Sequence, residues 1–99
     1  MMYYKIYERR FGVLIAVCDL DLCGKTLKKG DIDFHINPRF YKDKEGDRDK
    51  IIELLKESVN YNLVGKEAVQ CGIDAGVINP ENVIKIEDVP HAQGLLMNL

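Results

Sequence analysis

The stretch Gly12-Val-Leu-Ile-Ala-Val-Cys18 decides the fold, because it is the most apolar run of the chain. It is rich in β-branched residues, and a polar residue, Asp19, follows it at once. A short run of this kind is typical of a strand that is buried on both faces rather than of a helix. We therefore expect residues 13–18 to form a central strand, which needs a covering layer on each side.

Length and composition indicate one globular domain. The 99 residues are 46% hydrophobic and 30% charged, which is ordinary for a protein with a single core. No apolar run approaches the roughly 18–20 residues of a membrane span, and the N-terminus lacks the layout of a signal peptide. Three cysteines cannot all pair within one chain, in agreement with a reducing compartment. We predict one domain, residues 1–99, in the cytoplasm and away from membranes.

The net charge of −2 conceals an asymmetry between the two halves. Residues 1–50 carry 11 Lys and Arg against 9 Asp and Glu, whereas residues 51–99 carry 3 against 7. The pI of about 5.6 argues against a nucleic-acid-binding protein that works by bulk positive charge. A local basic patch in the first half stays open as an alternative.

Two further strands are predicted around the central one. Residues 3–8 alternate weakly and are rich in tyrosine, so they form an antiparallel hairpin with the central strand. Residues 31–36 alternate strictly, which predicts a half-exposed third strand that ends before Pro38.

The segments between the strands are predicted as short connections. Asp19 caps a single helical turn that Gly24 ends. Phe40 and Tyr41 attach the next segment to the core. The highly charged residues 42–50 are expected to form a mobile surface loop.

Two helices follow in the second half. The first is predicted over about 47–64, and the second over 66–75 with a face of small residues. A last strand over 83–86 precedes a loop at 90–94 and an apolar tail at 95–99. The apolar stripe of the first helix consists of Ile52, Leu55, Val59 and Leu63.

The predicted order is therefore β-β-β-α-α-β. It describes an α+β fold, with a mainly antiparallel sheet of about four strands and two helices packed on one face. The second face of the central strand is left for the apolar tail or a partner subunit to cover. Self-association is expected from the apolar residues near the C-terminus. They are Val89, Leu95, Leu96, Met97 and Leu99.

Two familiar motifs are incomplete. Gly24-Lys25-Thr26 matches the end of a phosphate-binding loop, but Asp19 occupies the place of the first glycine and its carboxylate repels phosphate. Cys18 in the apolar strand and Cys71 on the small-residue helix face are positions where cysteine behaves as a small hydrophobe. A nucleophilic cysteine with His91 as base lacks a third, orienting group. We predict no metal site and no cofactor.

One polar group is a candidate ligand site. Pro90-His-Ala-Gln93 follows a strand end, where ligands gather in open sheets, and His91 can transfer protons near neutral pH. The alternative is that His91 and the helix-borne Asn62 only bond backbone groups at the ends of elements. No catalytic residue is assigned, and the sequence leaves open whether the protein is an enzyme. The candidate ligand-binding residues are Asp19, Lys25, Asn62, His91 and Gln93.

Seven short motifs are spread over nearly the whole chain: Ala16-Val-Cys-Asp19, Leu22-x-Gly-Lys25, Phe40-Tyr41, Asn62-Leu-Val-Gly65, Ala75-Gly76, Pro80-Glu-Asn-Val-Ile84 and Val89-Pro-His-Ala-Gln93. Together they resemble the archaeal domain of unknown function family 424, and the closing Pro-His-Ala-Gln run is the most specific of them. The resemblance implies an archaeal cytosolic protein, and it implies no mechanism. Cys23 and Tyr61 depart from the aliphatic and the small residue expected at their positions.

Three functions fit the sequence. One alternative is a small enzyme or small-ligand binder with a polar pocket around His91, in which Lys25 holds an anion. Another alternative is an oligomeric interaction protein that associates through the apolar tail. The function that we expect is a translation-related binding module for RNA or a ribonucleoprotein, with exposed tyrosines that stack bases and cations that hold phosphates. Its candidate nucleic-acid-binding residues are Arg9, Arg10, Lys25, Lys28 and Lys29.

Overall fold

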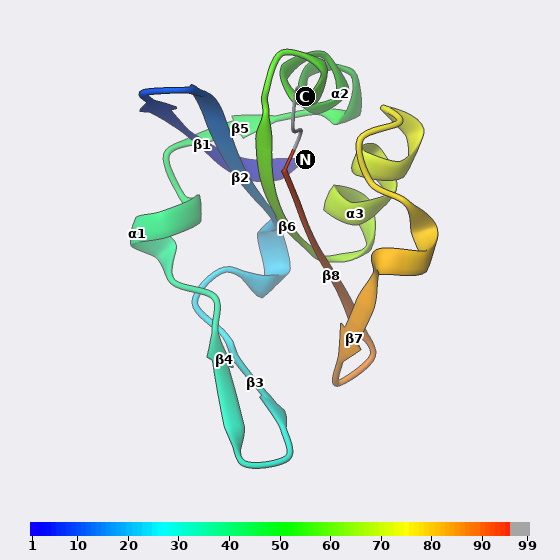
Figure 1. The fold of residues 1–99 in the computed structure, drawn as a ribbon. Helices are drawn as coiled ribbons and strands as arrows, with labels where there is room; N and C mark the ends of the chain where they lie inside the picture. Colours follow the sequence, from blue (N-terminus) through cyan, green and yellow to red (C-terminus); the bar gives the residue numbers. More distant parts are fainter. Residues whose placement is uncertain (96–99) are drawn as a thin grey trace.

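A mixed sheet of six strands forms the centre of the computed structural model, which describes residues 1–95 (Figure 1). The strands lie in the order β5-β1-β2-β6-β8-β7. β2 and β6 run parallel, and the other four neighbouring pairs are antiparallel. The strand bounds are β1 Met2–Arg9, β2 Gly12–Asp19, β5 Lys44–Gly46, β6 Asn60–Val64, β7 Ile84–Ile86 and β8 Val89–Leu95.

Helices and a separate hairpin surround this sheet. The hairpin, β3 Thr26–Lys29 with β4 Ile32–His35, extends beyond one end of the sheet (Figure 1). The described residues also form two 3₁₀ turns, η1 Leu20–Leu22 and η2 Pro80–Asn82. The α-helices of residues 1–95 are α1 Pro38–Tyr41, α2 Arg48–Lys56 and α3 Lys66–Asp74.

The central strand is confirmed. Ile15, Ala16, Val17 and Cys18 are each 0% exposed. Because side chains alternate along a strand, Ile15 and Val17 pack with α2 and α3 on one face, while Ala16 and Cys18 belong to a second cluster on the other face. Every position of the run is apolar because both faces of β2 are covered.

The second face is covered by α1 and the β3–β4 hairpin. Tyr41 of α1 and Leu27 of β3 are buried against it, with Phe34 packed beside them. α1 and the hairpin thus supply the cover that we expected from the apolar tail or a partner subunit. Leu95 ends β8, and residues 96–99 lie outside the described part of the chain.

The α+β class is confirmed, and α2 and α3 do pack on one face, but the predicted strand number and order are wrong. The third predicted strand exists as β4, yet it pairs with β3 rather than with the sheet. Residues 42–50 are not a loop, because β5 pairs with β1 as an edge strand. Asp47 then caps α2, accepting a hydrogen bond from the backbone N–H of Lys50 at 2.9 Å.

The predicted helix over 47–64 is wrong in its second half. α2 ends at Lys56, and residues 60–64 form β6 beside β2. An apolar spacing of four residues continues to Leu63, but Tyr61 and Leu63 also alternate with two asparagines. The alternation prevails because a strand here pairs with β2 on one side and β8 on the other, which satisfies its backbone.

The predicted loop at 90–94 is part of β8. Pro90 and Gly94 are residues that weaken a strand, and they conceal it in the sequence. A tight turn at Glu87 and Asp88, both with positive φ, joins β7 to β8. β8, the last strand of residues 1–95, is thus longer than β7 and lies inside the sheet.

Candidate functional site

Three of the five candidate ligand residues share one face of the sheet. Asn62 of β6 lies directly opposite Gln93 of β8, and Val64 lies opposite His91. Residues directly opposite one another point to the same side, and Val64 belongs to the cluster under α1 and the hairpin. Asn62, His91 and Gln93 therefore all point to the face that carries α1.

His91 is a buried histidine with one fixed nitrogen. It is 6% exposed, and its Nδ1 lies 2.9 Å from the carbonyl oxygen of Leu63. A carbonyl oxygen only accepts, so Nδ1 carries the hydrogen and Nε2 of the neutral ring is an acceptor. Burial lowers the pKa of His91 below its usual value of 6.5, which keeps the ring neutral at pH 7. The ring of Phe34 packs against it at 4.9 Å between centroids.

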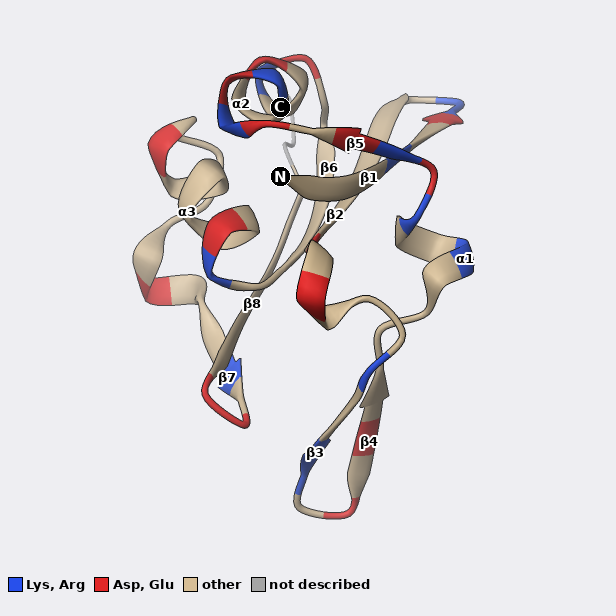
Figure 2. Cartoon of the chain, turned by 180° about the vertical axis from the view of Figure 1, so that it is seen from behind, with Lys and Arg blue, Asp and Glu red and all other residues tan. Residues whose placement is uncertain are grey.

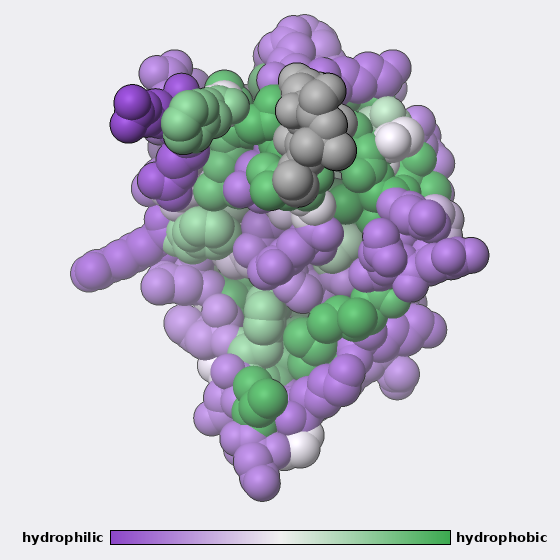
Figure 3. Space-filling view, in the orientation of Figure 1, coloured by the Kyte–Doolittle hydropathy of each residue, from purple (hydrophilic) through white to green (hydrophobic). Residues whose placement is uncertain are grey.

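A pocket of about 380 Å³ opens beside this histidine, between the hairpin, η2, β7 and β8. Apolar side chains gather over the hairpin and β7 in the lower half of Figure 3, where Ile32 and Ile84 are 70% and 48% exposed. A mainly apolar pocket with a few polar groups is typical of small-ligand sites. We call it the His91 pocket; it is lined by Phe34, Asn82, Ile84, Ile86, His91 and Gln93.

Asn62 is held by α1. The hydroxyl of Tyr41 donates to Oδ1 of Asn62 at 2.7 Å, and burial raises the pKa of Tyr41, so the hydroxyl remains a donor. This bond occupies the carbonyl oxygen of the Asn62 amide, and Gln93 lies directly opposite Asn62 in the neighbouring strand. Gln93 is exposed. The sheet therefore presents a pair of amides at its centre.

Cations and aromatic rings alternate on the same face at β1. Lys5 Nζ and Arg9 Cζ each lie 5.3 Å from the centroid of the Tyr7 ring. Tyr7 stacks on Phe40 at 5.3 Å, and its hydroxyl donates to the Phe40 carbonyl at 2.8 Å. Lys5 Nζ donates to the carbonyl of Arg39 at 3.1 Å. α1 is thus fastened to β1 by the residues that alternate along the strand.

These side chains form one cationic group, which consists of Lys5, Arg9, Arg39 and Lys42. Lys42 Nζ lies 5.2 Å from the ring of Tyr3. Figure 2 shows the cations of the β1–β2 tip, α1 and the start of β5 gathered along one edge of the molecule. Glu45, opposite Tyr3 in β5, points to the same side and offsets part of this charge. The sequence indicated this surface in part, because the tyrosines of residues 3–8 and Arg9 were assigned to RNA binding, whereas Lys5, Arg39 and Lys42 were not.

Asp19 does not join the face that carries α1. Its carboxylate lies at the end of β2, 7% exposed, and accepts hydrogen bonds from the backbone N–H groups of Glu67 at 3.2 Å and Ala68 at 2.9 Å. Burial raises the pKa of Asp19 in spite of these bonds. Gly65 has a φ of +110°, and a Cβ there would lie 2.3 Å from the Asp19 carboxyl carbon. Asp19 therefore caps α3 rather than the turn after β2.

The five candidate nucleic-acid residues fall into two separate groups. Arg9 and Arg10 lie at the β1–β2 tip, and Lys25, Lys28 and Lys29 lie on or next to β3 at the far end of the molecule (Figure 1). Lys25 is exposed and does not line the His91 pocket. The structure therefore adds Lys5, Arg39 and Lys42 to Arg9 instead, because α1 folds back over β1.

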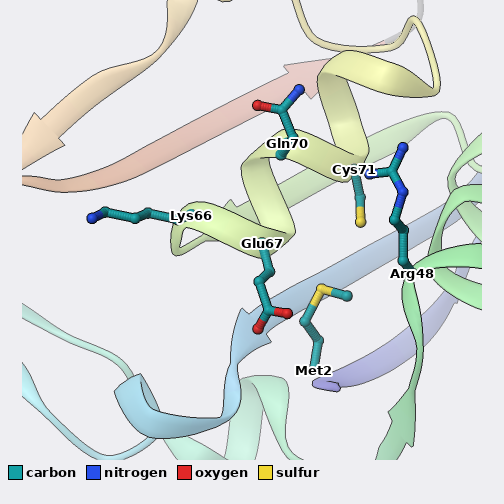
Figure 4. A pocket seen from close by; sticks show the side chains of 6 residues that line it. All are labelled: Met2, Arg48, Lys66, Glu67, Gln70 and Cys71. Atoms are coloured by element: carbon teal, nitrogen blue, oxygen red, sulfur yellow. The ribbon is translucent and has the colours of Figure 1, made fainter.

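A second hollow of about 310 Å³ lies between the start of β1, α2 and α3 (Figure 4). Its Arg48 is paired with Asp74 at 2.5 Å. Burial raises the pKa of Cys71, which keeps the thiol protonated at neutral pH. Lys66 points away from the other side chains (Figure 4). This hollow offers no activated group.

Residues 1–95 contain no group of three or more His, Cys, Asp or Glu placed to hold a metal ion. Among the helices of the same residues, none has the length and apolar character needed to cross a membrane.

A family model described as "Protein of unknown function (DUF424)" matches residues 7–97. The chain belongs to this family. A similar fold is found in the crystal structure of an uncharacterized conserved protein from Methanopyrus kandleri, an archaeon. The match has a TM-score of 0.83 at 26% identity and covers 99% of this DUF424 chain and 95% of the other. None of the curated proteins matches it. These comparisons establish the family and the fold. The function must be inferred from the candidate site.

Proposed function

We propose that this DUF424 protein binds single-stranded RNA over α1 and along β1 and β8 on either side of it, where Arg9 and Gln93 are exposed. The observation that supports it is a row of neighbouring side chains, the Arg9–Gln93 row, in which each residue contacts the next or lies opposite it in the adjacent strand. It runs from β1 to β8 over three strand spacings, or about 14 Å. Its members in order are Arg9, Tyr7, Phe40, Tyr41, Asn62 and Gln93.

The row combines the side chains that single strands need. Arg9 and the other cations of the cationic group can pair with phosphates, and the half-buried rings of Tyr7 and Phe40 can stack on bases in a sequence-tolerant way. The tyrosines that we expected to be exposed are buried or half-buried, and the buried Tyr41 only positions Asn62. The amides of Asn62 and Gln93 can bond base edges, which only an unpaired strand exposes fully. A duplex would hide those edges and meet the row with its phosphates alone.

Local charge supports this surface although the chain is acidic. The net charge is −2, so the protein as a whole repels RNA weakly. The cationic group gathers four positive charges, which are offset in part by Glu45 on the same side and by Asp43, the residue after Lys42. Ionic screening limits electrostatic interactions to about 8–10 Å. The cationic group, rather than the net charge of the protein, therefore determines where phosphates bind.

The test is a fluorescence anisotropy titration with a labelled single-stranded RNA of about 12 nucleotides, a length in the range of small single-strand sites. We expect affinity to fall as salt rises. The triple variant Arg9→Ala, Arg39→Ala and Lys42→Ala should lower the slope of log affinity against log salt by about 2, because each single-strand phosphate contact contributes about 0.7.

The matched control is the triple variant Lys25→Ala, Lys28→Ala and Lys29→Ala, which removes the same charge from the hairpin end. We expect it to leave the salt slope of the wild type unchanged. Absence of binding at low salt, or an equal loss in both triple variants, would contradict the proposal.

A further inference from the structure

We infer that the His91 pocket binds a single nucleobase, with Nε2 of His91 accepting a hydrogen bond from an N–H group of the base. The inference deepens the proposed function and rests on it for the source of the base. The chemistry of the pocket is argued separately, from its own lining.

His91 is a buried polar group with an unused acceptor. The ring is 6% exposed, and Nδ1 is committed to the Leu63 carbonyl. Nε2 makes no hydrogen bond with any atom of residues 1–95. Every fully buried side-chain nitrogen or oxygen of these residues has a hydrogen-bond partner, so Nε2 is not fully buried. Nε2 is therefore reachable from the pocket that His91 lines. A ligand N–H placed there would satisfy an acceptor that the protein itself leaves free.

The lining excludes charged ligand groups. None of the six side chains that line the pocket carries a charge while His91 is neutral. A phosphate, carboxylate or ammonium group in this pocket would lose its hydration without gaining a counter-charge. The part of the ligand that enters the pocket is therefore uncharged.

The shape and the polar groups favour a flat heterocycle. The ring of Phe34 and the side chains of Ile84 and Ile86 supply apolar walls, and the amides of Asn82 and Gln93 each offer a donor beside an acceptor. A base edge has the same alternation of donors and acceptors, and its faces are apolar enough to stack. A sugar would need more polar partners than this lining contains.

The pocket lies at the end of the Arg9–Gln93 row. Gln93 belongs to both, because it lines the pocket and stands opposite Asn62 in the sheet. A strand that crosses the row from β1 thus reaches the pocket with one base. A free nucleoside carries the same base without phosphates, so it is the second source to test.

The experiment follows the amide signals of the ¹⁵N-labelled protein during titrations with adenosine, guanosine, cytidine and uridine, and with the four RNA homopolymers of about 10 nucleotides. The key variant is His91→Asn, whose side-chain NH₂ can still donate to the Leu63 carbonyl while Nε2 is lost. The matched control is His35→Asn, which changes the other, exposed histidine on β4. Phe34→Leu is a second variant that keeps an apolar wall and removes the ring.

We expect at least one nucleoside to shift the amide signals of Phe34, Ile84 and Gln93. His91→Asn should weaken that nucleoside about tenfold, the usual effect of one lost hydrogen bond in a desolvated site. Phe34→Leu should weaken it as well, and His35→Asn should leave the affinity unchanged. The matching homopolymer should bind more tightly and also shift the signals of Tyr7 and Phe40.

The outcomes separate the two proposals. If homopolymers shift Tyr7 and Phe40 but neither they nor any nucleoside shifts the pocket signals, the pocket inference is overturned and RNA binding stands. Unchanged nucleoside affinity in both His91→Asn and Phe34→Leu overturns the pocket inference too. If a nucleoside binds in the pocket and no homopolymer binds more tightly, the base comes from a free nucleoside and RNA binding fails.

Discussion

The cations of the β1–β2 hairpin and those of the β3–β4 hairpin have different neighbours. In the first, Lys5 and Arg9 each lie 5.3 Å from the ring of Tyr7. In the second, Lys28 stands directly opposite Asp33. A ring face leaves most of a cation's charge available to an anion, whereas a facing carboxylate compensates it. The number of basic residues in a hairpin therefore does not by itself identify a binding surface.

The largest expected difference concerns the turn glycines of the two hairpins. Gly12 has a φ of +134°, and a Cβ there would lie 2.3 Å from Cγ2 of Val59. Gly12→Ala combines overpacking with backbone strain, so we expect it to lower the free energy of unfolding by about 3 kcal/mol or more. Gly30 has a φ of +61° with no atom within 4 Å of the added Cβ, and Gly30→Ala should lower it by about 1 kcal/mol.

Urea unfolding of both variants measures this pair. Equal losses of stability would mean that the first hairpin is packed no more tightly against its surroundings than the second.

The second prediction reverses one charge in each hairpin. Arg9→Glu should weaken RNA binding about tenfold, because it replaces a phosphate-pairing cation with a repelling carboxylate. Lys28→Glu should change the affinity less than about twofold, since that site lies outside the Arg9–Gln93 row. Anisotropy titrations at low salt compare the two, and a larger effect at Lys28 would move the binding surface to the other hairpin.

The third prediction concerns the anchor of the β3–β4 hairpin. The backbone N–H of Lys28 donates to the Glu87 carboxylate at 2.6 Å. Glu87→Gln replaces this charged acceptor by a neutral one, so amide exchange of Lys28 should speed up about fivefold, or about 1 kcal/mol. The amides of β1 serve as the internal reference, and their exchange rates should stay as in the wild type. Unchanged exchange at Lys28 would show that other contacts hold the hairpin.

The smallest effect is a pH dependence where the second hairpin meets the sheet. The pKa of His91 is lower in the folded protein than its usual 6.5 because the ring is buried under Phe34. The unfolded chain therefore binds more protons below about pH 6.5, and the free energy of unfolding should fall as the pH drops through that range. Urea unfolding at about pH 7.5 and about pH 5.5 measures the loss.

The variant His91→Asn should lose this part of the pH dependence, and His35→Asn should retain it. If His91→Asn and the wild type lose the same stability on acidification, the histidine is not the titrating group.

The central strand could be predicted because every position of residues 13–18 is apolar, a pattern that no other short element shares. β6 could not, because its residues fit a helical spacing as well as an alternation, and only its pairing with β2 and β8 decides between them. β8 was concealed by Pro90 and Gly94. Strand pairing between distant segments overrides the local signal in both cases.

The candidate site was predicted in part for a related reason. Asn62, His91 and Gln93 were grouped as polar residues, although they were assigned to a helix and a loop rather than to neighbouring strands. Arg39 and Lys42 were missed, because their position over β1 depends on the stacking of Phe40 on Tyr7. No pattern in the sequence of α1 predicts this contact with β1.

The Asp19 carboxylate has a consequence for where chemistry can occur in this fold. Parallel neighbours such as β2 and β6 usually leave a crevice beyond their carboxyl ends, where substrates settle. Here Asp19 stands at that edge, and both of its oxygens accept hydrogen bonds from backbone amides in the first turn of α3, while a hollow of about 190 Å³ remains beside it. Asp19 is therefore committed to holding the start of α3, and a ligand at this edge would meet Asp21, Lys66 and Asp88 instead.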